Sequence, residues 1–148
     1  MPDVIGIHHV KVPVTDLDRS IEWYGRVLGF EPALYFEDQD DVVRGVEMRR
    51  DGCEPAIALR VVPERAAALR DYDPVAYLVE DDAAINAWAA HLDELGVAHG
   101  PVVKASVGWL MMCKDPDGIE VRFYTRATHS DVPKGTTIRP GGPAPGPR

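Results

Sequence analysis

Cysteine, basic residues and long apolar segments are all scarce in this sequence. The two cysteines, Cys53 and Cys113, are too few for a disulfide framework and lack the spacing of metal ligands. No unbroken apolar run exceeds five residues, as at Trp109–Cys113, and Asp3 stands where a signal peptide would be basic. With 16 Lys and Arg against 24 Asp and Glu, the formal charge is −8, which repels phosphate backbones. We therefore expect a cytoplasmic protein that binds neither nucleic acid nor membranes.

The residues that are abundant suit one compact domain with a mixed fold. The chain has 148 residues, and Leu, Ile, Val and Phe together number 37, which is enough for a core and above the level typical of disordered chains. Val occurs 18 times and Leu nine times. Because β-branched residues favour strands, this excess argues against an all-helical bundle.

The first half of the chain has the pattern β-α-β-β-β. Residues 4–14 are rich in β-branched side chains, and Thr15 provides a hydroxyl cap for a helix over about 16–28, with Gly29 at its end. Apolar residues recur within that helix at helical spacing. Three further strands, separated by polar turns, are predicted at residues 32–37, 42–50 and 56–62.

The second half repeats this order of elements. A helix begins at the Asp81–Asp82 cap and ends before Gly96, and strands are predicted at residues 75–79, 102–103, 109–114 and 119–124. A shift of 65 residues places Val10 on Val75, Asp16 on Asp81 and Trp23 on Trp88. The two halves are therefore a divergent internal repeat.

These patterns divide the chain into one domain over residues 1–126 and a tail over 127–148. The domain contains two modules, at about 4–62 and 73–126, joined by a connector at 63–72 to which we assign no function. The end of the tail is rich in Pro and Gly, a composition that cannot build a packed element. An alternative is that residues 131–138 fold back over the domain or a partner subunit.

Strand alternation predicts which side chains face a cavity. In the last strand Ile119, Val121 and Phe123 are apolar, so Glu120, Arg122 and Tyr124 share the other face. The same reasoning places Arg60 opposite Ile57 and Leu59 in its strand, and His9 and Lys11 together in the first strand. The adjacent His8 and His9 are expected to point in opposite directions and not to ligate one metal together.

The opening stretch HHVKVPVTDLDRSIEWYGRVLGF, the closing stretch DPDGIEVRFY and the repeat together resemble the vicinal oxygen chelate superfamily. Its members include glyoxalase I, fosfomycin and bleomycin resistance proteins, and extradiol dioxygenases. The resemblance covers about residues 4–126. It implies an α+β fold of two βαβββ modules whose curved mixed sheets surround an open cavity, and it implies a homodimer, as in many relatives.

In metal-using relatives a histidine before the first-strand valine is a ligand, and the resemblance assigns that position to His9. The equivalent residue of the second module is Pro74, which cannot ligate, and the usual carboxylate position holds Arg122. Glu120 shares the face of Arg122, but it is displaced by about 6 to 7 Å along the strand. We therefore predict no metal and no other cofactor. The alternative is one divalent metal that involves His9 and Glu120.

Side chains replace the metal as the source of positive charge in the predicted ligand site. Lys11, Arg60 and Arg122 share the inferred cavity face and suit an anionic or carbonyl-rich ligand. Trp109, Tyr124 and Tyr35 provide flat apolar walls for an aromatic ligand. His9 and Glu120 complete the predicted ligand-binding set. In another interpretation Arg122 merely neutralises Glu120, or Glu47 across the sheet.

The leading functional hypothesis is a metal-independent small-molecule-binding protein of the glyoxalase/bleomycin-resistance type. The first alternative is a divalent-metal enzyme of the glyoxalase or dioxygenase kind. The second is a metal-free enzyme in which His9 or Glu120 acts as a general base beside Arg122. The sequence leaves open whether the protein is an enzyme and which reaction it would catalyse, because one fold of this kind supports many functions.

Overall fold

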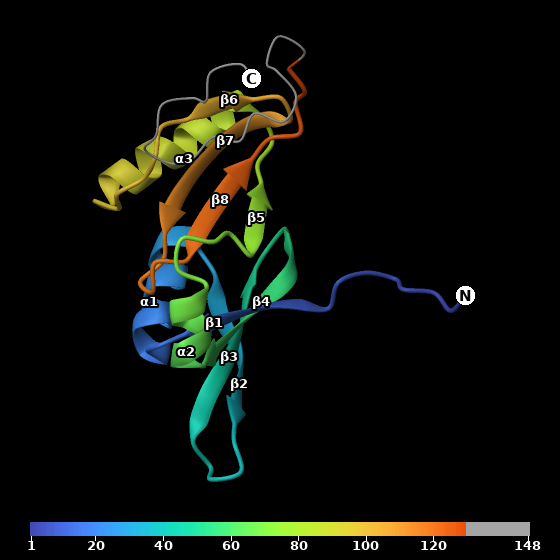
Figure 1. The fold of residues 1–148 in the computed structure, drawn as a ribbon, viewed down its shortest axis with the longest axis vertical. Coiled ribbons are helices and arrows are strands. Elements are labelled where there is room, and N and C mark those ends of the chain that lie inside the picture. Colours follow the sequence, from blue (N-terminus) through green and yellow to red (C-terminus); the bar gives the residue numbers. More distant parts are fainter. Residues whose placement is uncertain (130–148) are drawn as a thin grey trace. The chain divides into compact units, whose positions relative to one another are not determined.

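The computed structural model describes residues 1–129, which form two compact units with a four-stranded sheet each (Figure 1). The first unit contains residues 1–70 together with the turn at 115–119. The second contains residues 71–114 and 120–129. Within residues 1–129, no helix is both long and apolar enough to span a membrane.

The first unit has the order β-α-β-β-β followed by a short helix. Its elements are β1 (His9–Val14), α1 (Leu17–Leu28), β2 (Glu31–Glu37), β3 (Val43–Arg50), β4 (Cys53–Val61) and α2 (Pro63–Ala68). The strand order in the sheet is β1-β4-β3-β2. β1 runs parallel to β4, whereas β4, β3 and β2 are antiparallel neighbours.

The second unit repeats this topology. Its elements are β5 (Val75–Leu78), α3 (Asp82–Glu94), β6 (Val103–Ala105), β7 (Gly108–Lys114) and β8 (Glu120–Tyr124). The strand order is β5-β8-β7-β6, with β5 parallel to β8 and the other pairs antiparallel. Two βαβββ modules with mixed sheets confirm the predicted α+β fold class.

The repeat also extends to the helix starts. Asp16 caps α1 by accepting the backbone N–H of Arg19 at 3.0 Å, and Asp81 caps α3 by accepting that of Ala84 at 2.8 Å. These caps are the residues that the 65-residue shift superimposes. The prediction that the Thr15 hydroxyl caps the first helix is wrong, because Thr15 precedes the cap and bonds to Asp117 instead.

Each helix packs its apolar side against its own sheet. In the first unit Tyr24, Val27 and Leu28 of α1 are buried, as are Ile57 and Leu59 of β4. In the second unit Ile85 and Leu92 of α3 are buried, and Trp88 stacks on Phe123 with ring centroids 4.6 Å apart. Burial of one such large side chain stabilises the fold by about 1.5 to 3 kcal/mol.

Two sequence expectations about chain segments need correction. The β-rich stretch at 4–14 is a strand only from His9, the residue at which β1 begins to pair with β4 through Ala56. Figure 1 shows the preceding residues leading away from the sheet. His129, placed in the tail by the sequence, packs on the second unit with its Nδ1 2.8 Å from the Ala105 carbonyl oxygen. The suggested fold-back of residues 131–138 lies outside the described residues.

Candidate functional site

The face of the first sheet that points away from α1 carries two of the predicted site residues. Lys11 of β1 is in register with Ala58 of β4, and Pro13 is in register with Arg60. Paired residues of adjacent strands point to the same face, so Lys11 and Arg60 share it. The core residues Val12, Ile57 and Leu59 occupy the opposite face, which confirms the alternation predicted for both strands.

A pocket lies where this face meets α2. Its volume is about 350 Å³, at the lower end of the range of small-molecule sites. Its polar lining consists of Lys11, Arg60 and Arg65. We call it the β1–α2 pocket, and its apolar walls are formed by Pro13, Val62, Ala68 and Leu69.

The three cations of the β1–α2 pocket differ from several other cations among residues 1–129. Among residues 1–129, none of the three forms an ion pair with a carboxylate. Five other described cations do pair in this way, namely Arg19 with Asp117, Arg44 with Asp38, Arg49 with Glu47, Lys114 with Asp71, and Arg122 with Asp73 and Glu120. The pocket is therefore a local concentration of uncompensated positive charge in an acidic chain.

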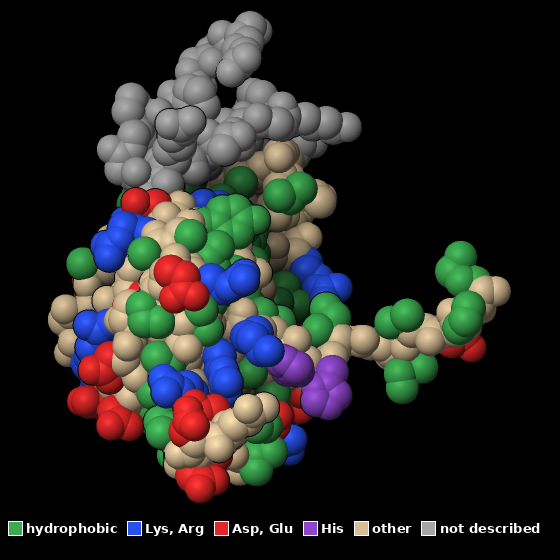
Figure 2. Space-filling model, turned by 60° about the horizontal axis from the view of Figure 1, so that its bottom comes forward, with side chains coloured by type: hydrophobic (Ala, Val, Ile, Leu, Met, Phe, Trp, Pro, Cys, Tyr) green, Lys and Arg blue, Asp and Glu red, His purple; other side chains and the backbone are tan. Residues whose placement is uncertain are grey.

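A buried acidic residue on the same sheet face, Glu47, is paired with another cation. Glu47 of β3 is in register with Ala58 and is only 7% exposed. Its carboxylate accepts a hydrogen bond from the Arg49 Nε at 2.6 Å. On the face drawn in Figure 2, several basic side chains lie next to one another beside histidines.

The second unit holds the other predicted cation in an ion-pair cluster. Arg122 donates from Nη2 to Glu120 at 2.9 Å, and its Nε lies 3.3 Å from an Asp73 carboxylate oxygen. Burial works against the charge of Arg122, but hydrogen bonds to Glu120 and Tyr124 outweigh it and raise the pKa of the guanidinium. Two carboxylates thus neutralise Arg122 and occupy its donors.

The remaining predicted residues lie at several different places. Glu120, Arg122 and Tyr124 share one face of β8, as expected. Trp109 does not join them. It lies on the same face of β7 as Met111, which is in register with Phe123 of β8, and this is the face opposite to Arg122. Trp109 instead makes an edge contact with the His129 ring, with centroids 5.4 Å apart.

His8 and His9 lie in contact, contrary to the sequence expectation. Their Nδ1 atoms are 3.0 Å apart and their rings meet edge to face. Strand alternation does not separate them, because β1 begins at His9 and His8 lies outside it. His9 is exposed and is not among the residues that line the β1–α2 pocket.

The donors suggested for a family-type metal do not fit one. Glu120, the substitute carboxylate, is engaged by the Arg122 guanidinium at 2.9 and 3.2 Å, which places a permanent cation beside it. Over residues 1–129, no three His, Cys, Asp or Glu side chains are grouped as a metal would require. We derive no chemical step through a metal.

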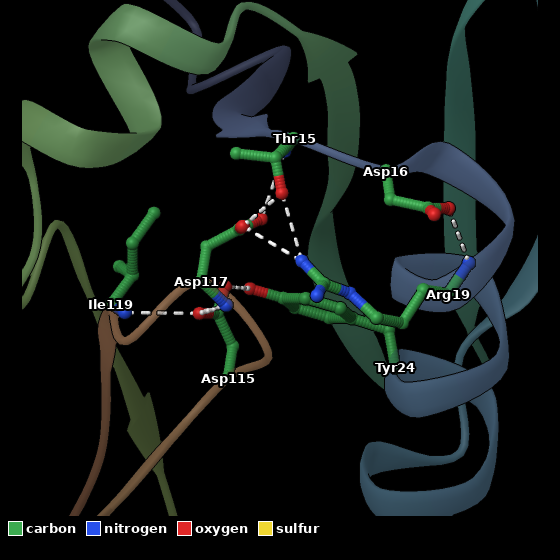
Figure 3. Close-up of polar contacts among 7 residues, drawn as sticks. All are labelled: Thr15, Asp16, Arg19, Tyr24, Asp115, Asp117 and Ile119. Carbon is green, nitrogen blue, oxygen red and sulfur yellow. Dashed lines mark hydrogen bonds and ion pairs between the residues drawn. The ribbon is translucent and has the colours of Figure 1, made fainter.

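A buried carboxylate organises the turn at residues 115–119 (Figure 3). Asp115 accepts the backbone N–H groups of Asp117 and Ile119 through Oδ1, each at 2.9 Å. Its Oδ2 accepts the Tyr24 hydroxyl of α1 at 3.2 Å. Burial raises the pKa of the Asp115 carboxyl, although these three hydrogen bonds favour its ionised form.

Asp117 connects the same turn to the start of α1. Its Oδ2 accepts the backbone N–H of Thr15 at 3.0 Å, and its Oδ1 accepts the Arg19 Nη2 at 2.9 Å and the Thr15 hydroxyl (Figure 3). Asp117 is 5% exposed, so the ion pair with Arg19 satisfies a nearly buried charge. The whole cluster is hydrogen-bonded internally, which indicates a structural role.

The sequence analysis missed Arg65 as a site residue, because it assigned no function to the connector at 63–72. One signal was present in the sequence. Arg65, Ala68 and Leu69 are spaced i, i+3 and i+4, which places them on one side of a helical turn. Pro63 at the first helical position marks the start of that turn.

Comparisons with solved structures agree with the observed fold. TnmS3, an antibiotic binding protein from Streptomyces sp. CB03234, matches with a TM-score of 0.72 and 21% identity, covering 86% of this chain and 100% of that chain. A lactoylglutathione lyase from Agrobacterium tumefaciens matches with a TM-score of 0.64 and 16% identity, covering 84% of this chain and 96% of that chain. The fosfomycin resistance protein FosX from Listeria monocytogenes matches with a TM-score of 0.64 and 15% identity, covering 84% of this chain and 96% of that chain.

Family comparison is decisive at the level of the superfamily. No curated protein sequence matches the chain significantly. The Glyoxalase/Bleomycin resistance protein/Dioxygenase superfamily matches residues 6–123, which include both modules. With two βαβββ modules and a family match over most of its length, the chain belongs to the glyoxalase/bleomycin resistance protein/dioxygenase superfamily.

Proposed function

We propose that this protein is a metal-independent small-molecule-binding protein of the glyoxalase/bleomycin-resistance type. The observation that carries the proposal is the β1–α2 pocket, in which three cations without a carboxylate partner among residues 1–129 surround apolar walls. Pockets that combine apolar walls with a few convergent polar groups are typical of ligand sites. No Asp, Glu or His lines the pocket. Its residues are therefore explained by ligand binding alone, without a catalysed reaction.

The relatives support a binding function without defining the ligand. TnmS3 is described as an antibiotic binding protein and FosX as a fosfomycin resistance protein. Their identity to this chain is 21% and 15%, so the likeness establishes the fold and not a shared ligand. We therefore propose a ligand of small-molecule size, and we argue its chemical class below from the pocket itself.

The experiment is a ligand screen on the full chain by thermal denaturation, with each hit verified by calorimetry. The library includes anionic, neutral and cationic metabolites and antibiotics, each tested with and without EDTA. A bound ligand raises the melting temperature according to its concentration and affinity. We expect hits whose affinity EDTA leaves unchanged. Loss of every hit in EDTA would contradict metal independence, and the absence of any hit in either condition would contradict the binding function.

Several expectations from the sequence stay predictions. They are the homodimer, which sedimentation equilibrium would test, and the cytoplasmic location. The participation of Arg122, Glu120, Tyr124, His9 and Trp109 in ligand binding is also untested, but none of these residues lines the β1–α2 pocket, where we propose that the ligand binds. Glu120 is a poor general base in the observed arrangement, because its carboxylate is bonded to Arg122. The metal-free enzyme is therefore less well supported than the binding protein.

A further inference from the structure

We propose that the β1–α2 pocket binds an aliphatic chain that ends in an anionic oxygen head group, a carboxylate or a phosphate. This inference rests on the proposed binding function and names the ligand class of the same site. It depends on three features of the pocket, which are its charge, its walls and its size.

The charge of the pocket comes from three separate elements. Lys11 lies on β1, Arg60 on β4 and Arg65 on α2, and all three line one cavity. Each side chain would be electrostatically more stable with a carboxylate nearby, and five other described cations have one. An anionic head group provides the missing partner. Two guanidinium groups are suited to oxygen anions because each presents several N–H donors in a plane.

The walls of the pocket select the body of the ligand. Pro13, Val62, Ala68 and Leu69 are all aliphatic, and no aromatic side chain lines the pocket. An aromatic ligand would find no ring to stack on, whereas a methylene chain gains about 0.8 kcal/mol for each buried CH₂ group. Trp109 and Tyr124, which the sequence assigned to an aromatic ligand, are not part of this pocket. The aliphatic preference therefore follows from the residues that are present.

The size of the pocket limits the length of that chain. A volume of about 350 Å³ is small for a ligand site, and it is shared between the head group and the body. Medium-chain molecules such as octanoate and octyl phosphate suit this space. Ligands of about ten non-hydrogen atoms reach only modest affinity, so we expect dissociation constants near the millimolar range.

The test is a titration of the ¹⁵N-labelled full chain followed by NMR. The probes are octanoate, octyl phosphate, 1-octanol and octylamine, which share one chain length and differ in the charge of the head group. We expect octanoate or octyl phosphate to shift the amide signals of residues 11–13 and 60–69, 1-octanol to bind at least about fivefold more weakly, and octylamine to leave those signals in place. Whichever anion binds more tightly identifies the head group as carboxylate or phosphate.

Arginine variants test whether the anion binds in this pocket, and they distinguish the loss of a positive charge from the loss of the fold. Arg60→Ala and Arg65→Ala should each weaken binding of the better anion about tenfold or more, the loss expected for one hydrogen bond to a charged group. Arg126→Ala, which removes an exposed arginine that does not line the pocket, is the matched control and should leave the affinity unchanged. Amide spectra of the free variants show whether each one is folded. Higher salt should weaken binding of the anion, since the interaction is electrostatic.

The outcomes distinguish this inference from the proposed function. Equal binding of 1-octanol and the anions, unchanged affinity in both arginine variants, or signal shifts confined to other residues would each overturn the ligand class. If neither anion binds while the library yields another ligand, the binding function stands and the class is wrong. If the library yields no ligand at all, both proposals fail.

Discussion

The side chain of Arg60 lies across Gly45, its neighbour on the adjacent strand β3. A Cβ atom added at Gly45 would come within 3.2 Å of the Arg60 Cδ and 3.4 Å of its Nη1. The backbone oxygen of Leu59 would lie 3.1 Å away. The absence of a side chain at Gly45 thus leaves room for the end of the Arg60 side chain over β3, the neighbour of β4 on the side away from β1.

Gly45→Ala tests this arrangement. The added methyl group should displace the Arg60 guanidinium from β3 toward β1 and the pocket, and so strengthen octanoate binding about threefold or more. Stability should change by less than about 1 kcal/mol, because the lower entropy of the unfolded chain offsets the tight contacts. NMR titration and urea denaturation measure the two effects. Unchanged affinity in a folded variant would show that the position of Arg60 over Gly45 does not matter to the pocket.

Asp115→Ala should strongly destabilise the fold. The change leaves two buried backbone N–H groups and the Tyr24 hydroxyl without their acceptor, and each such loss costs about 1 to 3 kcal/mol. Urea denaturation would measure the loss of unfolding free energy. Tyr24→Phe is the matched variant that removes only one of the three bonds, and it should lose less stability. Equal stability of wild type and Asp115→Ala would contradict the role of Asp115 in holding the turn.

The raised pKa of Asp115 predicts a pH dependence that Asp115→Asn removes. A carboxyl group whose pKa is higher in the folded state binds protons more strongly there, so its contribution to stability falls as pH rises from its unfolded pKa through its folded pKa. Asn can keep the two backbone N–H bonds through its oxygen and donate to the Tyr24 oxygen without a buried charge. Relative to wild type, Asp115→Asn should therefore gain stability as pH rises through that interval. Denaturant titrations at a series of pH values would measure the difference, and a constant difference would contradict the raised pKa.

Arg122→Ala distinguishes a structural cation from a ligand-binding one. Its removal leaves Glu120, only 6% exposed, next to Asp73 without a counter-charge, and should lower stability by about 1 to 3 kcal/mol. Because two carboxylates already occupy Arg122, we expect the affinity of an anionic ligand to remain within about twofold of wild type. Calorimetry on the folded variant measures the affinity. A loss of tenfold or more would restore Arg122 to the ligand site that the sequence predicted.

Metal analysis tests the absence of a family-type metal. Protein purified without added metal, and with any histidine tag removed, should contain far less than one equivalent of zinc, iron, manganese or nickel per chain. The reason is that Glu120 is paired with Arg122, a permanent cation that would repel a metal ion. About one equivalent that disappears in His9→Ala would contradict the prediction. Glu94→Ala, in an exposed residue of α3, is a suitable control.

The sequence by itself determined the modules and most element positions. The 65-residue repeat predicted two similar units, and the observed N-caps Asp16 and Asp81 fall on matching positions. Alternation in β4 and β8 separated the buried Ile57, Leu59, Val121 and Phe123 from the residues on the opposite faces. These features are local, because helical periodicity, capping and strand alternation depend on residues close together in the chain.

Only the tertiary structure decided which of the candidate residues lie together. Lys11 and Arg60 line one pocket because β1 and β4 pair in parallel, although the two residues are 49 positions apart in the sequence. Arg65 lines the same pocket because α2 packs beside β1. Arg122 is instead neutralised by Asp73, and no sequence pattern predicts that these two residues lie close together. Strand alternation gives the face of a side chain but not its partners, since partners depend on strand register and on contacts between residues distant in the chain.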